Sequence, residues 1–189
     1  MYSELLYLIV VLGVLILLTY VEAFRSEHVS NLWGGLPKKP WVFSTILTVI
    51  SFLYLSINWV FIMDDEQLFD KPFIEYRHYV LLQYILFLSG AVLWSFSTLL
   101  ALQRQRKMLF VLFVLWMTAL GSIGIFVMTC GLEDQILMQI CGTIMMLHHV
   151  IFDALWWWIT FNVNPPQVNS ANTSRRTPTV TDYNNLQYI

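Results

Sequence analysis

The segment "LHHVIFDALWWW" at residues 147–158 places three side chains capable of chemistry in an otherwise apolar stretch. On an α-helix His149 and Asp153 lie four residues apart on one face and can touch, whereas His148 is turned about 100° away from His149. Three roles fit these residue types. The pair can join helices by hydrogen bonds, it can line a ligand pocket in which Asp153 fixes the tautomer of His149, or it can support metal or acid–base chemistry.

The third role requires more donors than the sequence supplies. A metal ion needs at least a third ligand. Gln83 and Asn58 are expected near the outer ends of their segments, and Cys141 lies about two helical turns from the histidines. No serine or cysteine is placed beside a histidine as an activated nucleophile. We therefore expect no metal ligand set and no enzyme activity, and an enzyme built on the three side chains of the quoted segment is the weakest alternative.

The composition indicates which environment surrounds these groups. Of the 189 residues 58% are hydrophobic, 16% aromatic and 12% charged, and the mean hydropathy is +0.64, which lies well beyond a soluble domain. The formal net charge is −2 and the ten lysines and arginines are scattered, so the chain has no basic face for nucleic acid. The sequence therefore predicts an integral, multi-pass membrane protein whose first partner is the lipid bilayer.

Five segments are long and apolar enough to cross a bilayer, which takes about 20 residues per helix. They predict an all-α bundle of five transmembrane helices over residues 1–162, with spans at about 4–23, 41–63, 79–103, 108–130 and 135–161. Lysine and arginine gather after the first and third spans and in the tail, whereas the connection after the second span is acidic. Because positive charge stays in the cytoplasm, we expect the N-terminus out and the C-terminus in.

Residues 163–189 are rich in proline, serine, threonine and asparagine. They carry too little apolar content to form a core, so they are predicted to be a disordered cytoplasmic tail. Within the tail, Tyr183 and Leu186 fit the tyrosine-x-x-hydrophobic pattern that sorting adaptors read as an extended peptide. A solvated tail without such a signal is the simpler alternative. The first span is expected to stay uncleaved, because no positive charge precedes it.

Polar residues on the spans indicate which faces meet other helices. In the second span Ser44, Thr48, Ser51 and Asn58 share one side of a helix. Small and polar residues on a spanning helix allow close approach and hydrogen bonds between helices. The histidines of the fifth span fall near the bilayer midplane, where an ionised aspartate costs roughly 2.5 to 3.5 kcal/mol. Asp153 is therefore expected to face protein or water rather than lipid.

The tryptophans divide into two groups by depth. Tryptophan at the ends of spans belongs to the interfacial belt of membrane proteins. This group comprises Trp33, Trp41, Trp59 and Trp156 to Trp158. Trp94 and Trp116 lie too deep for that belt, so we expect them to pack in the core or to line a cavity.

The first connection and the two spans after it resemble the TspO/MBR family of tryptophan-rich sensory or translocator proteins. In "WGGLPKKPW", Trp33 stands six and seven positions before Lys39 and Pro40. "STILTVISFLYL" is similar to the start of that family's second helix, and "LWS" at 93–95 to its third-helix tryptophan motif. The likeness covers roughly residues 33–100. Gly34 replaces the tyrosine of the family's Trp-Tyr pair, and its Pro-Pro and its Pro-Tyr-x-x-Trp signature are absent.

This resemblance implies a pocket in the cytoplasmic half of the bundle for a tetrapyrrole, a sterol or a similar flat hydrophobic ligand. It implies Trp33, Lys39 and Trp41 at the mouth and Trp94 and Trp116 in the wall. A histidine of the fifth span would then be able to bind a haem iron. The resulting candidate site comprises Trp33, Lys39, Trp41, Trp94, Trp116, His148, His149 and Asp153.

We therefore interpret the chain as a membrane protein that binds or senses a flat hydrophobic small molecule in an aromatic-lined interior. The alternative of a different class is a non-catalytic scaffold or accessory subunit, in a homo-oligomer or a larger membrane complex, whose tail recruits adaptors. These two interpretations differ in whether the polar groups of the fifth span hold a ligand or only join helices.

Overall fold

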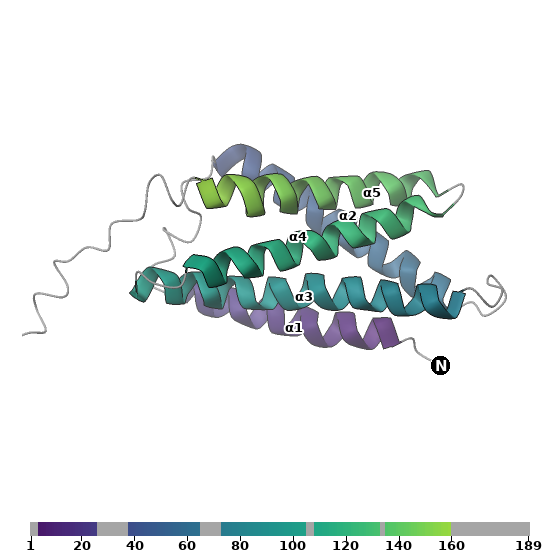
Figure 1. Ribbon diagram of the computed structural model, residues 1–189, viewed down its shortest axis with the longest axis horizontal. Helices are drawn as coiled ribbons and strands as arrows, with labels where there is room; N and C mark the ends of the chain where they lie inside the picture. The colour runs from purple at the N-terminus through teal and green to yellow at the C-terminus, as the bar shows by residue number, and fades with distance from the viewer. Residues whose placement is uncertain (1–3, 26–37, 65–72, 105–107, 133–134, 160–189) are drawn as a thin grey trace, which may run out of the picture.

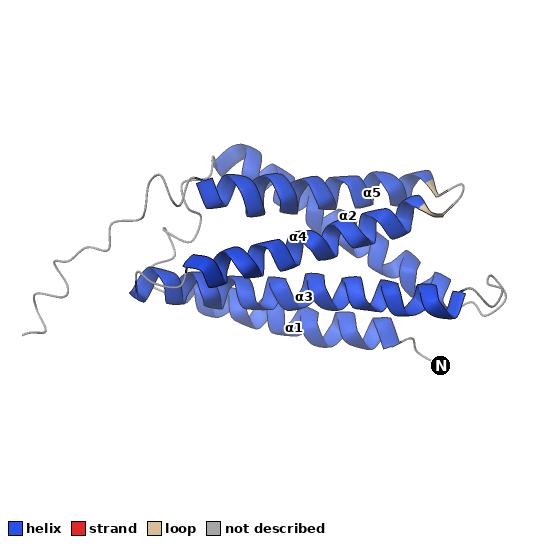
Figure 2. Cartoon of the chain, viewed as in Figure 1, coloured by secondary structure: helices blue, strands red, loops and turns tan. Residues whose placement is uncertain are grey.

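The computed structural model describes residues 4–25, 38–64, 73–104, 108–132 and 135–159, and this part of the chain is almost entirely helical (Figure 1, Figure 2). The elements are α1 (Glu4–Arg25), α2 (Lys38–Asp64), α3 (Phe73–Arg104), α4 (Met108–Cys130), α5 (Ile136–Leu147) and the π-helix η2 (His148–Trp157), which continues α5. The predicted all-α fold is confirmed. The predicted tail, with Tyr183 and Leu186, lies outside the described residues, as does Trp33.

Five helical stretches are long and apolar enough to cross a membrane. They run over 4–25, 39–63, 77–98, 109–130 and 136–157, close to the predicted spans. Apolar segments of this length form helices because the hydrocarbon core offers no water to satisfy backbone N–H and C=O groups. The chain is thus a multi-pass integral membrane protein. The orientation in the membrane stays a prediction. Following that prediction, we use the term outer end for the end of the bundle that holds the start of α1 and the turn between α4 and α5.

The surface of α1 shows that the bilayer is the solvent of this fold. Only Leu5 and Ala23 of α1 are buried, while side chains such as Leu17, Leu18 and Phe24 are exposed. Contiguous apolar surface on this scale is rare in soluble monomers. In a membrane it contacts acyl chains, so α1 needs little burial within the bundle to be stable there.

The helices form an open arrangement in which α2 crosses the others obliquely (Figure 1). α3 packs most extensively on α4 and also contacts α1, while α5 lies between α2 and α4. Few backbone contacts join α2 to α3, and aromatic side chains bridge the two helices instead: the ring of Phe52 lies 6.1 Å from Tyr84 and 5.3 Å from Phe87, centre to centre.

Glycine sets the close approach of α3 and α4. A Cβ atom added to Gly121 would lie 2.8 Å from the Cα atom of Phe87, and one added to Gly90 would lie 2.9 Å from the backbone nitrogen of Thr118. Both distances are too short for real carbon contacts, so neither position accepts a side chain without moving the backbone. The prediction that small residues permit close packing between spans is confirmed for this pair of helices.

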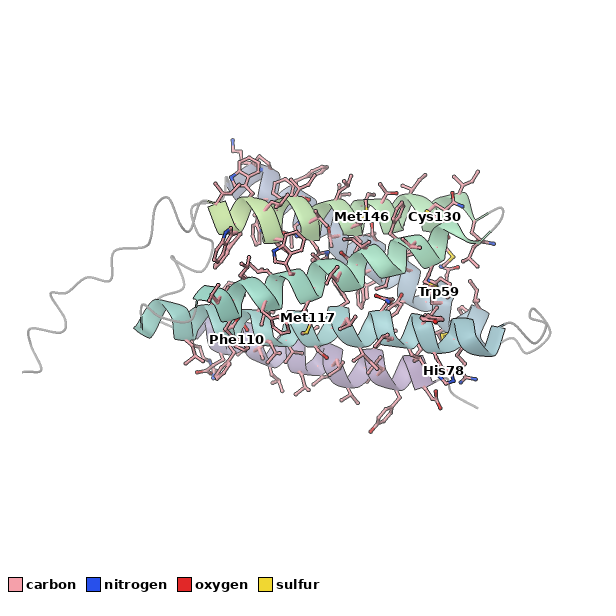
Figure 3. All side chains as sticks on the ribbon, viewed as in Figure 1. Trp59, His78, Phe110, Met117, Cys130 and Met146 are labelled. Carbon is pink, nitrogen blue, oxygen red and sulfur yellow. The ribbon has the colours of Figure 1, made fainter. Side chains whose placement is uncertain are left out.

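The buried core lies toward the outer end of the bundle. Trp59 is completely buried there, although its depth alone predicts a place in the interfacial belt. Figure 3 shows its side chain between α2 and α3. The other buried members of the core are Leu5, Leu55, Met63, Val80, Tyr84, Phe87, Leu88, Ile125, Met138, Cys141 and Met145.

Candidate functional site

The fifth span changes its helix type at His148, the first of its titratable residues. The α-helical pattern of α5 ends at Leu147, and the ten residues of η2 form a π-helix. π-helices are rare, usually a single turn long, and frequent at functional sites. Side chains five residues apart point about 140° apart on an α-helix, whereas the i→i+5 bonds of a π-helix stack them. The π-helix therefore brings His148 to Asp153 as well, a contact that the α-helical spacing did not predict.

Both histidines approach the same carboxylate oxygen. The Nε2 atom of His149 lies 3.9 Å from Oδ2 of Asp153, so the predicted contact between them is confirmed. The Nε2 atom of His148 lies 3.7 Å from the same oxygen. The two imidazole rings meet edge to face, 5.1 Å apart. Both histidines are buried, while the side chain of Asp153 keeps 24% exposure. We call these three residues the His–Asp cluster.

The far side of each imidazole is also occupied. Nδ1 of His149 donates to the backbone carbonyl of Met145 at 2.7 Å. A carbonyl oxygen can only accept, so the proton must be on Nδ1. Nδ1 of His148 is 2.8 Å from the hydroxyl of Ser44 on α2. These bonds fix both rings, and they direct both Nε2 atoms toward Asp153.

Three other helices supply the surroundings of Asp153. The indole of Trp41 on α2 is an electrostatic neighbour of the carboxyl group. The hydroxyl of Tyr20 on α1 interacts electrostatically with Asp153. The ring of Tyr20 in turn lies 5.9 Å from that of Trp94 on α3. The structure thus brings Trp41 directly to the cluster and Trp94 to its periphery.

A continuous series of rings passes through the cluster. Phe87 meets His149 edge to face at 4.8 Å, and His148 stacks on Phe152 at 5.7 Å. Phe152 then stacks on Trp156 at 5.6 Å, with only 9° between the ring planes. The series reaches the bundle surface at Trp156, which is 39% exposed. We call it the aromatic row; its members are Phe52, Phe87, His149, His148, Phe152 and Trp156.

The remaining predicted site residues do not join this neighbourhood. Trp116 is 38% exposed on α4, and among the described residues no ring contact links it to the cluster. Lys39 is exposed at the start of α2. Trp116 was expected to pack in the core or to line a cavity. Its exposure excludes the core, and a place in a cavity wall stays a prediction.

Sequence reasoning missed several members of the site. The i, i+4 spacing could have identified Met145 as the carbonyl partner of His149 and Phe152 as the ring partner of His148. Ser44 was expected on an interior face of α2, but no local pattern pairs it with a histidine 104 positions away. Tyr20 carries no distinguishing signal, since its neighbours are on other helices.

The donor atoms of the cluster fit two kinds of chemistry. One suitable ligand atom from each of His148, His149 and Asp153 lies within 4.8 Å of the others, so the three can hold a cation between them. They can equally share a proton in a hydrogen-bonded unit. Where neutral imidazoles lie beside a carboxylate in an apolar medium, either a cation or a shared proton is needed between them. Without it, hydrogen-bond acceptors that face each other repel.

No protein-family model, no curated protein and no solved structure matches this chain. These comparisons give no support to a TspO/MBR assignment, so the roles of the site residues rest on their own geometry. Fold and site define the class: a multi-pass helical membrane protein with aromatic clusters and a buried histidine–aspartate cluster at a π-helix.

Proposed function

We propose that the protein binds or senses a flat hydrophobic small molecule, of the tetrapyrrole or sterol kind, that partitions into the bilayer. The observation that supports this function is the aromatic row, which extends from the buried Phe87 to the exposed Trp156. Stacked rings that reach a lipid-facing surface offer apolar faces to a planar ligand arriving through the membrane. The His–Asp cluster beside them offers polar contacts that orient it.

The ligand would lie against η2 and the cytoplasmic halves of α1 and α2. Tyr20, Trp94 and Phe152 are all half-buried there, so part of each ring stays available. A tetrapyrrole carries ring nitrogens and propionates, and these match the imidazole and indole groups around Asp153. A sterol would use the ring faces and a single hydroxyl. The site thus favours planar ligands with a small number of polar atoms.

A protoporphyrin titration tests this function. The purified protein in detergent is titrated with protoporphyrin IX, and quenching of tryptophan fluorescence is followed. We expect saturable quenching, and Phe152→Leu should weaken binding up to about tenfold, because an aromatic pair contributes about 0.5–1.5 kcal/mol beyond its buried area. Trp94→Phe should have a smaller effect in the same direction.

Trp116→Phe is the matched control, since it removes one tryptophan that has no ring contact with the aromatic row among the described residues. Its affinity should equal that of the unaltered protein. Linear quenching with the same slope in all these proteins would indicate partition into micelles and would remove the proposed function.

A second candidate function, a membrane scaffold or accessory subunit, is favoured by a different observation. α1 buries only two of its residues against the bundle, which leaves most of its apolar surface open to another spanning helix. In that function the His–Asp cluster only joins α2 to η2. It predicts that the purified protein elutes as a defined oligomer or co-purifies with another membrane protein, and that porphyrin quenching is linear.

A further inference from the structure

We propose that His148, His149 and Asp153 bind a divalent transition-metal ion, for which Zn²⁺ is the reference metal. Metal binding at this cluster does not depend on the proposed hydrophobic ligand. The cluster supplies two imidazole nitrogens and one carboxylate oxygen, all within 4.8 Å of one another and all from one helix. Two histidines with one carboxylate are the protein ligands of several zinc and non-haem iron sites.

The distances are close to those of a zinc site. Ligands at about 2.0–2.1 Å from a tetrahedral zinc ion lie roughly 3.4 Å from one another. The carboxylate oxygen of Asp153 lies 3.7 Å from Nε2 of His148 and 3.9 Å from Nε2 of His149. The two imidazole nitrogens lie within 4.8 Å of each other, so side-chain rotation has to bring the two rings closer together around an ion.

The hydrogen bond behind His149 has the polarity that a metal requires, and the hydroxyl behind His148 is able to accept in the same way. Because His149 donates from Nδ1 to the Met145 carbonyl, the lone pair of its Nε2 faces the carboxylate oxygen. Ser44 occupies the corresponding place behind His148. Histidines that bind metals almost always donate their second N–H to such a partner, and ligating carboxylates also carry an outer hydrogen bond. The indole of Trp41 is an electrostatic neighbour of the Asp153 carboxylate.

The π-helix is the feature that completes the ligand set. On a continuous α-helix only His149 would reach Asp153, and two ligands hold an ion weakly. The π-helix starts at His148 itself and moves that residue onto the same carboxylate. A helix bonded i→i+5 is rare in proteins, so its occurrence over these three residues points to the same conclusion as the ligand distances.

The ligand types restrict the metal. Nitrogen and oxygen donors without a thiolate favour Zn²⁺, Fe²⁺, Co²⁺ and Ni²⁺ over soft ions such as Cu⁺. Three protein ligands leave a fourth coordination position for water or an external molecule, as in catalytic rather than structural zinc sites.

Cobalt is a suitable probe, because Co²⁺ occupies zinc sites and its visible ligand-field absorption reports coordination by nitrogen and oxygen. The full-length protein, purified in detergent with a tag that contains no histidine and stripped with a chelator, is titrated with CoCl₂ and then with ZnCl₂. We expect one Co²⁺ per chain with a tetrahedral-type spectrum, displaced by one equivalent of Zn²⁺.

Four variants locate the site. Asp153→Asn and His149→Gln should weaken Co²⁺ binding at least 100-fold, and Ser44→Ala should weaken it by roughly 10-fold, at the lower end of the range for outer hydrogen-bond partners. His78→Gln is the matched control, since His78 is an exposed histidine at the outer end of α3 (Figure 3). It should bind Co²⁺ with unchanged affinity.

Thermal unfolding with and without Zn²⁺ gives a second readout. Zn²⁺ should raise the melting temperature of the unaltered protein and of His78→Gln, but not that of Asp153→Asn, because only an intact site couples metal to folding. A missing ligand-field spectrum, or equal Co²⁺ affinity in Asp153→Asn and the unaltered protein, would overturn the metal site and leave the cluster as a hydrogen-bonded unit. Porphyrin binding is measured on separate metal-free samples, so the two proposals fail independently.

Discussion

Replacing Gly121 with alanine is expected to destabilise the protein by about 1–3 kcal/mol, the usual cost of overpacking a well-packed interior. The added Cβ atom would meet the backbone of Phe87 on α3, and a backbone cannot rotate away as a side chain can. α3 and α4 form the most extensive helix pair of the bundle. Their separation would therefore loosen the whole fold, and the midpoint of SDS-induced unfolding in mixed micelles should fall.

Two other glycines serve as controls for this prediction. Nothing lies within 4 Å of a Cβ placed on Gly13, so Gly13→Ala should be neutral or should stabilise the protein by up to about 1 kcal/mol through helix propensity. A Cβ on Gly124 would meet only the flexible side chain of Gln83, so Gly124→Ala should have an intermediate effect. If Gly121→Ala and Gly13→Ala behave alike, the close approach of α3 and α4 is not what holds the bundle together.

Replacing Asp153 with leucine is expected to cost about 1–3 kcal/mol in metal-free protein, because buried polar groups lose their partner. The groups concerned are the Nε2 atoms of both histidines. Adding His149→Leu to this variant should cost much less than His149→Leu alone, since one of the unsatisfied groups leaves with it. The coupling between the two positions should be about 0.5–3 kcal/mol, measured as SDS unfolding of the four proteins with chelator present.

Thr143→Val provides the matched control on the same span. Its hydroxyl bonds only to the carbonyl of Gln139 on its own helix, so its effect should add to that of Asp153→Leu within about 0.5 kcal/mol. Simple additivity of His149→Leu and Asp153→Leu would show that the 3.9 Å approach has no energetic consequence. A double variant that is as stable as the unaltered protein, yet no longer binds Co²⁺, would separate the functional role of the cluster from its structural one.

Local periodicity predicted several parts of the site correctly. The contact of His149 with Asp153 follows from their spacing by four on one helix, whatever the rest of the fold does. The buried positions of Thr48 and Ser51 on α2 follow from their common helix face. Residues with this kind of local relation need no knowledge of neighbouring helices.

Other positions depended on partners far away in the chain. Trp59 and Trp116 are both tryptophans on spanning helices, but Trp59 is fully buried and Trp116 is 38% exposed. The sequence predicts the depth of both residues in the membrane, but it does not predict the direction in which each side chain points. That direction depends on how a helix is rotated about its axis, which packing against other helices decides.

The sequence by itself determined the medium, the number of spans and the all-α class of this protein, because the length and polarity of a segment decide whether it crosses a bilayer as a helix. Only the tertiary structure decided the composition of the candidate site. Ser44 pairs with His148, and Trp41 and Tyr20 approach Asp153, only because α2 packs on the fifth span and a side chain of α1 reaches toward it. Such contacts depend on the relative rotation and tilt of helices, which no local pattern encodes.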